Sequence, residues 1–152
     1  MNETIFHMAI KAAQQAFIED EIPVAAIIFD SKTNKIISCC TNKTEKHSNS
    51  LAHAEILAVT EACQLLNKKR LDGYSVFVTL EPCAMCAAAL SIARIDHVYF
   101  GAFDPKTGGI FQGCKTYEHS QTHHKPKVTG GIQADICGKL LSDFFKKKRS
   151  KQ

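Results

Sequence analysis

The sequence predicts an α/β protein, a three-layer α/β/α sandwich with helices on both faces of a central sheet. Helical and extended patterns alternate from one end of the chain to the other, which is typical of strands separated by helices. Residues 74–80 are apolar at nearly every position, as expected of a central strand that is covered on both faces. A length of 152 residues fits one domain, residues 1–152, with a single core.

The first half of the chain predicts a helix, a hairpin and a second helix. Residues 2–19 repeat apolar side chains at helical spacing, and Pro23 bars extension of this helix. Residues 24–29 and 35–40 are short apolar and β-branched runs joined by a polar turn, a pattern that predicts a hairpin. Residues 51–66 carry an apolar stripe at helical spacing and predict the second helix.

The second half of the chain continues the alternation after the central strand. We expect Pro82 to restart the chain as a helix, because proline fits the first helical position, and the alanine-rich residues 84–92 continue it. Residues 97–100 and 127–129 predict two further strands. Residues 132–145 predict a closing helix with one apolar face.

The composition is that of a globular protein. Hydrophobic residues make up 45% of the chain and charged residues 22%, which argues against disorder and fibrous architecture. No apolar run approaches the roughly 18 residues that a bilayer crossing requires. The first residues lack the basic start and apolar block of an export signal, so we expect a cytoplasmic protein with its seven cysteines as thiols or metal ligands.

Positive charge is concentrated at the end of the chain. Residues 1–118 have a formal charge of −2, whereas residues 119–152 have a formal charge of +6. A local excess of cations suits a polyanion such as nucleic acid. Charge alone supports a solubilising tail equally well.

Four residues in two short segments carry the candidate chemistry: His53 and Glu55 in the first, Cys83 and Cys86 in the second. Each pair alone is a weak signal. A histidine or glutamate at the head of a helix can be a capping or dipole-facing residue, and free cysteines are often packing residues.

The combination of the two segments is more specific. Cys83 and Cys86, three residues apart at a helix start, present both sulfurs beyond that end, where the helix dipole stabilises thiolates. His53 supplies a nitrogen ligand from another helix start. One histidine and two cysteines leave a position open for water, as catalytic zinc sites do, and Glu55 is close enough in sequence to reach that water.

The two segments also carry a family resemblance. His53-Ala54-Glu55 and Pro82-Cys83-Ala84-Met85-Cys86 resemble the signature of zinc-dependent nucleobase deaminases, H-x-E followed by P-C-x-x-C. Three further stretches resemble the bacterial tRNA-specific adenosine deaminases, and these stretches are Val78-Thr79-Leu80-Glu81, Lys106-Thr107-Gly108 and Leu140-Leu141-Ser142-Asp143-Phe144-Phe145.

This resemblance implies a cytidine deaminase-like fold with a mixed central sheet of about five strands. It implies one Zn²⁺ per subunit, held by His53, Cys83 and Cys86, with Glu55 as the catalytic proton carrier. The implied reaction is hydrolytic deamination of adenosine to inosine at the wobble position of a tRNA anticodon. It also implies contact with the anticodon stem-loop and a homodimer. The substrate-binding residues carried over by position are Asn42, Asp104, Lys106 and Phe145, and those for the RNA backbone are Lys146, Lys148 and Arg149.

Two other functions compete with this one. A deaminase of free guanine, cytosine or nucleosides needs no polyanion surface, so the basic end counts against it. A noncatalytic, zinc-stabilised RNA-binding module leaves Glu55 without a role. The chain also departs from the family pattern at Asn49-Ser50-Leu51-Ala52 and at Gly109-Ile110, which bears on the pocket rim rather than on the zinc chemistry.

Overall fold

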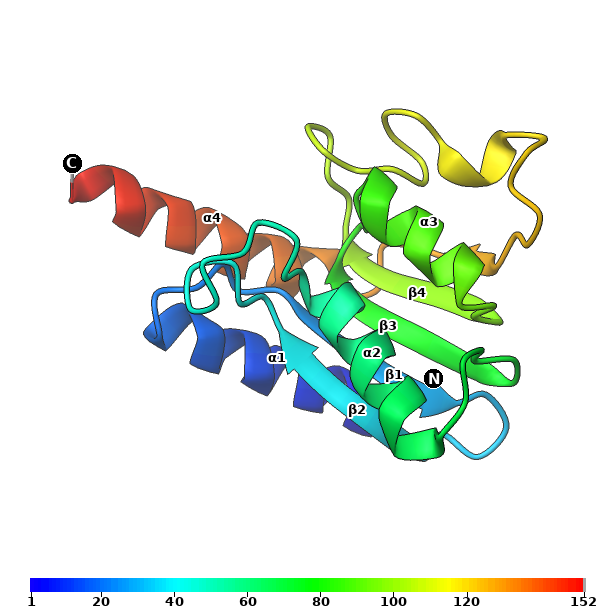
Figure 1. Cartoon of the computed structure of the whole chain (residues 1–152). Helices are drawn as coiled ribbons and strands as arrows, with labels where there is room; N and C mark the ends of the chain where they lie inside the picture. Colours follow the sequence, from blue (N-terminus) through cyan, green and yellow to red (C-terminus); the bar gives the residue numbers. More distant parts are fainter. Residues whose placement is uncertain (152) are drawn as a thin grey trace.

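The computed structural model describes residues 1–151 and contains five strands and four α-helices within them (Figure 1). In chain order the elements are α1 (Glu3–Ile18), β1 (Ala25–Asp30), β2 (Ile36–Thr41), α2 (Ala54–Leu66), β3 (Tyr74–Leu80), α3 (Ala84–Ile92), β4 (His97–Ala102), the 3-10 turn η1 (Thr116–Glu118), β5 (Lys127–Thr129) and α4 (Ala134–Ser150). No helix in this part of the chain is both long and apolar enough to cross a membrane.

The strands form one mixed sheet in the order β2-β1-β3-β4-β5. β1 runs antiparallel to both of its neighbours, whereas β3, β4 and β5 are parallel. The end of β2, the start of β1 and the ends of β3 and β4 therefore lie at one edge, where Ala25 pairs with Thr41 and Leu80 with Ala102. We call this edge the pocket edge.

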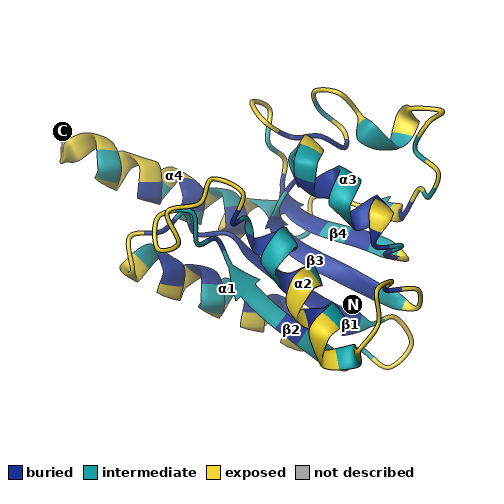
Figure 2. Ribbon diagram, viewed as in Figure 1, coloured by how far each residue is buried: buried dark blue, intermediate teal, exposed yellow. Residues whose placement is uncertain are grey.

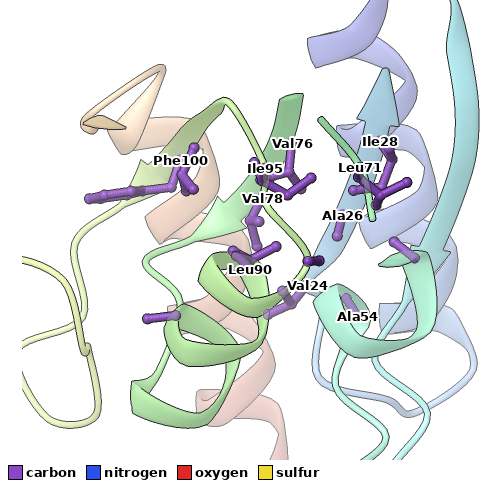
Figure 3. Packing of buried hydrophobic residues seen from close by; sticks show 14 of the residues in the cluster. Val24, Ala26, Ile28, Ala54, Leu71, Val76, Val78, Leu90, Ile95 and Phe100 are labelled. Atoms are coloured by element: carbon purple, nitrogen blue, oxygen red, sulfur yellow. The ribbon is translucent and has the colours of Figure 1, made fainter. Parts of the chain in front are cut away.

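Helices cover both faces of the sheet, as the sequence predicts. α2 and α3 lie on one face and α1 and α4 on the other (Figure 1). Figure 3 shows the core under α2 and α3, a cluster of buried apolar residues that includes Ile28, Val78 and Leu90. Ile27 and Phe77 point to the opposite face and pack under α1. Figure 2 shows β3 buried along most of its length, which confirms its predicted central place.

Several predicted boundaries differ from the structure, and three of these differences are described here. α2 begins at Ala54 instead of residue 51, because the three preceding residues form turns that bring His53 to the helix end. Pro82 does not occupy the first helical position of α3, since it precedes the N-cap residue Cys83. α4 continues to Ser150, five residues further than predicted, because its lysines and arginine are good helix formers and suit the last turn electrostatically.

α4 packs against β4 through a close approach at Gly101. A Cβ atom at Gly101 would lie 2.4 Å from Cys137 Sγ on α4 and 2.6 Å from the Thr79 carbonyl oxygen. Gly138 lies within α4, yet a Cβ atom there would meet only Ala102 Cβ, at 3.8 Å. The seating of α4 therefore depends on Gly101 and tolerates a side chain at position 138.

We expect opposite effects of alanine at these two glycines. Gly101→Ala should lower the free energy of unfolding by at least about 1 kcal/mol, because the added methyl group overpacks the β4–α4 contact. Gly138→Ala should raise it by up to about 1 kcal/mol, because alanine favours the helix interior. Chemical denaturation of both variants checks this. A stable Gly101→Ala protein would show that α4 is not seated by this contact.

Candidate metal centre and its pocket

The two segments with candidate ligands meet at the start of two helices on the same face of the sheet. His53 is the N-cap residue of α2, and Cys83, three residues after the end of β3, is the N-cap residue of α3. Cys86 lies in the first turn of α3 and is buried. Neither N-cap side chain makes a capping hydrogen bond within the described residues, so both point their donor atoms elsewhere.

These three donor atoms converge. His53 Nδ1 lies 3.6 Å from Cys83 Sγ and 3.5 Å from Cys86 Sγ, and all three atoms lie within 4.8 Å of one another. A tetrahedral zinc with bonds of about 2.3 Å to sulfur and about 2.05 Å to nitrogen separates those ligand atoms by about 3.6 Å. The donor set and its spacing therefore fit zinc with three protein ligands. Within residues 1–151, no other group of three potential ligands of this kind is found.

The two thiols are electrostatically unequal. The hydrogen bond from the Cys86 thiol, aided by the nearby His53, lowers the pKa of Cys83 to about 5. The same hydrogen bond and burial raise the pKa of Cys86. Of the two sulfurs, Cys83 is thus the one whose surroundings favour the thiolate, the form that binds a metal ion.

Glu55 lies beside the ligand group, in the first turn of α2. Its side chain is only 5% exposed, and burial raises the pKa of its carboxyl to about 7. A carboxyl with this pKa can both accept and release a proton near neutral pH, which is the property that general acid–base catalysis needs.

A pocket of about 460 Å³ opens over this group at the pocket edge. His53, Glu55 and Cys83 line it, and so do five residues that the sequence singled out for substrate or RNA contact: Asn42, Asp104, Lys106, Phe145 and Arg149. The predicted RNA-backbone residues Lys146 and Lys148 do not line it. The structure thus brings these residues from five parts of the chain to one cavity.

Asn42 is held in a fixed orientation. It is 6% exposed, and its side-chain nitrogen donates to Glu21 Oε2 at 3.4 Å and to Thr44 Oγ1 at 3.1 Å. Glu21, only 2% exposed, also accepts from the backbone N–H groups of Glu45 and Lys46. The side-chain nitrogen of Asn42 is therefore committed to its own loop, which leaves its oxygen as the group for a ligand.

Some basic side chains at the end of α4 make contacts within the fold, whereas Arg149 lines the pocket. Lys148 forms an ion pair with Asp20 at 2.7 Å, and Lys147 lies over the ring of Phe17. Arg149 reaches the pocket beside Phe145. The sequence predicted these residues as one group, whereas the helix turns them toward different neighbours.

Two buried glutamates near the pocket, Glu21 and Glu81, escaped sequence reasoning about the site. Each is 2% exposed and accepts hydrogen bonds from backbone N–H groups of a loop on the pocket rim. The available signal was a charged residue close to an apolar strand: Glu21 lies four residues before the start of β1, and Glu81 directly follows β3. Burial of such a charge requires hydrogen-bond partners.

Fold and site together define the class of protein, a zinc-binding deaminase. Residues 1–102 match the family model of the cytidine and deoxycytidylate deaminase zinc-binding region. The chain is also 43% identical to a tRNA-specific adenosine deaminase of Rickettsia bellii over 141 residues, which cover 93% of this chain and 97% of that relative. The chain therefore belongs to the tRNA-specific adenosine deaminase family, a group of hydrolytic enzymes.

Solved structures agree on the fold. A structure from a study of A-to-I editing by tRNA:A34 deaminases at the wobble position of transfer RNA superposes with a TM-score of 0.89 at 36% identity. The superposition covers 92% of this chain and 100% of the other chain. A guanine deaminase from Nitrosomonas europaea superposes with a TM-score of 0.82, over 95% of this chain and 84% of that one, but at 22% identity shows only that the fold is shared.

Proposed function

We propose that this protein deaminates adenosine to inosine at the wobble position of a tRNA anticodon. The observation that carries the proposal is the group of His53, Cys83 and Cys86 with Glu55 buried beside it, at the base of a pocket whose rim includes Lys106 and Arg149. Family membership and the relatives named above support the same substrate. Residues 1–152 would act as one deaminase domain.

His53, Cys83 and Cys86 would hold one zinc ion per subunit. When bound, zinc supplies Lewis acidity that lowers the pKa of water to about 7. Glu55 moves the protons in this proposal: its carboxylate takes one from the attacking water and delivers it to N1 of adenine as the water oxygen bonds to C6. The carboxylate then takes the second proton of that water from the new C6 hydroxyl group and passes it to the C6 amino group, which leaves as ammonia.

Other pocket residues would bind and orient the nucleotide. The side-chain oxygen of Asn42 can accept a hydrogen bond from the base, because its nitrogen is committed to Glu21 and Thr44. Phe145 offers an aromatic ring, 44% exposed, against which a base can stack. A target in an anticodon loop suits such a pocket, because unstacking is less costly there than in a duplex.

Three further expectations rest on the family resemblance and stay predictions. We expect a homodimer, and the exposed apolar side chains of Leu65 on α2 and Ile92 on α3, on one face of the sheet, give it a surface. We expect the protein to work in the cytoplasm, where tRNA is available. We also expect the protein to contact the anticodon stem-loop of its tRNA substrate.

The direct test is a substrate comparison with zinc-replete protein. Bulk tRNA, free adenosine, guanine and cytosine are incubated separately, and inosine at the wobble position and ammonia release are scored. We expect inosine in tRNA and no turnover of the free compounds. Ammonia from free guanine or cytosine with unchanged tRNA would instead identify a deaminase of free bases, the alternative that shares the fold.

Substitutions separate the proton carrier from the metal ligands. Glu55→Ala should keep zinc and the fold but lower turnover by at least about 100-fold, because proton transfer is lost. Cys83→Ser should lose both zinc and activity, whereas Cys39→Ser, on β2 and outside the ligand group, should keep both. Metal analysis and an inosine assay on the three variants check this. A Glu55→Ala protein with near wild-type turnover would contradict the mechanism.

The two cations at the end of α4 should contribute unequally to RNA binding. Arg149→Ala should weaken tRNA binding and reduce the slope of log affinity against log salt by roughly one unit, as for one lost phosphate contact. Lys148→Ala should change both less, because its ammonium group already pairs with Asp20. Titrations at several salt concentrations measure both slopes. Equal slopes in wild type and Arg149→Ala would remove Arg149 from the interface.

A further inference from the structure

Glu81 is a buried carboxylate at the pocket edge with no assigned role. It follows β3 directly and lies two residues before Cys83, and its own N–H group donates to the Ala102 carbonyl oxygen at 2.8 Å. Its side chain is 2% exposed. Among the described residues it has no ion-pair partner, so its charge must be compensated by hydrogen bonds.

Those hydrogen bonds all come from the backbone of one loop, residues 103–113, which follows β4. Oε1 accepts from the N–H group of Asp104 at 3.1 Å. Oε2 accepts from three consecutive N–H groups, those of Ile110, Phe111 and Gln112, at 3.2, 2.8 and 3.1 Å. One carboxylate therefore ties the beginning of the loop to its far end, through bonds that ionisation strengthens.

Hydrogen bonds within the loop connect the anchored residue Asp104 to residues that line the pocket. Asp104 Oδ1 accepts from the N–H groups of Lys106 and Thr107 at 3.1 and 3.0 Å, and Oδ2 accepts from the Thr107 hydroxyl. Asp104, Lys106 and Thr107 line the same pocket as His53 and Glu55. The bonds of Glu81 thus fix the backbone from which these rim residues project.

Two glycines let the loop lie directly on this support. A Cβ atom at Gly108 would lie 2.6 Å from Glu81 Cδ and 2.6 Å from the Asp104 carbonyl oxygen. A Cβ atom at Gly109 would lie 2.5 Å from the backbone nitrogen of Ala84, at the start of α3. The loop is therefore packed against both the carboxylate and the helix that carries Cys86.

We propose that Glu81 is a positioning residue for the RNA substrate: its carboxylate holds loop 103–113 so that Lys106 and Thr107 meet the nucleotides around the target base. Glu81 takes no part in proton transfer, because its oxygens are occupied by backbone donors. The proposal rests on the proposed function, since the ligand of the rim is taken to be the anticodon loop. It differs from a role in stability alone, which would leave substrate affinity unchanged.

The test compares Glu81→Gln with wild type in steady-state deamination of an anticodon stem-loop. The amide keeps the size of the side chain but turns an N–H group toward backbone donors, so the loop loses its anchor. We expect KM to rise about tenfold, because a factor of this size corresponds to the loss of one hydrogen bond to a charged group. We expect kcat and zinc content to stay within about twofold of wild type.

A double-mutant cycle with Lys106→Ala sharpens the test. If Glu81 acts by placing Lys106, the Lys106→Ala substitution should raise KM clearly in wild type and only slightly in the Glu81→Gln background. The matched control is Ser38→Ala, which removes another buried hydrogen bond, from Ser38 Oγ to the Ala58 carbonyl oxygen, outside the pocket lining. That variant should lose stability and keep its KM.

Several results would overturn the proposal. An unchanged KM in Glu81→Gln would show that Glu81 contributes to stability only. A loss of kcat alone would make Glu81 part of the chemistry. Additive effects of Glu81→Gln and Lys106→Ala on KM would show that Glu81 does not act through Lys106. If Glu81→Gln does not fold, Gly108→Ala replaces it, because its methyl group displaces the loop from the same carboxylate; an unchanged KM there counts equally against the proposal.

Failure of the proposed function would look different. It would show as absence of inosine with the wild-type protein, whatever happens in the variants. Amide hydrogen exchange at residues 104 and 110–112 would then decide the role of Glu81 in holding the loop. Exchange as slow in Glu81→Gln as in wild type would refute that role, and faster exchange confined to these amides would support it.

Discussion

The meeting of two helix N-termini at one edge of the sheet is the constraint on which the site depends. The N-cap residues of α2 and α3 are His53 and Cys83, whose side chains are of types that can bind a metal ion. Serine, threonine, aspartate or asparagine at these positions would cap the helix and contribute about 1 kcal/mol each. Neither N-cap side chain makes such a capping bond, and His53 Nδ1 and Cys83 Sγ instead lie 3.6 Å apart.

Three buried glutamates surround this meeting point, and their surroundings give them different tasks. Glu55 is only 5% exposed, and burial raises its pKa to about 7, which suits a group that exchanges protons. Glu21 and Glu81 are buried further but are surrounded by backbone N–H donors from the rim loops. A carboxylate with several donors is a structural anchor, because its charge is compensated where it stands.

Sequence reasoning reached the elements and the ligand group but not the arrangement of the rim. The alternation of patterns predicted the five strands and four helices of residues 1–151, because elements with a buried face have apolar residues at a regular spacing along the sequence. The convergence of His53, Cys83 and Cys86 was predictable because their types and spacing are chemically unusual. The hydrogen bonds of Glu81 could not be predicted, because they join its side chain to backbone N–H groups up to 31 residues away. Almost every residue has a backbone N–H group, so the residue types do not show which of these groups act as donors.

The rim is also where substrate choice must be decided. The Nitrosomonas europaea guanine deaminase shares this fold at a TM-score of 0.82 with only 22% identity, so the fold does not distinguish an RNA base from a free one. What can distinguish them is the set of groups around the pocket: Asn42, the loop with Lys106, and the end of α4 with Arg149. Each of these has its own contact: Asn42 donates to Glu21, the loop with Lys106 is held by Glu81, and α4 packs on Gly101 near its start, at Cys137. The groups that can decide substrate choice are therefore held by contacts other than those that bring His53, Cys83 and Cys86 together.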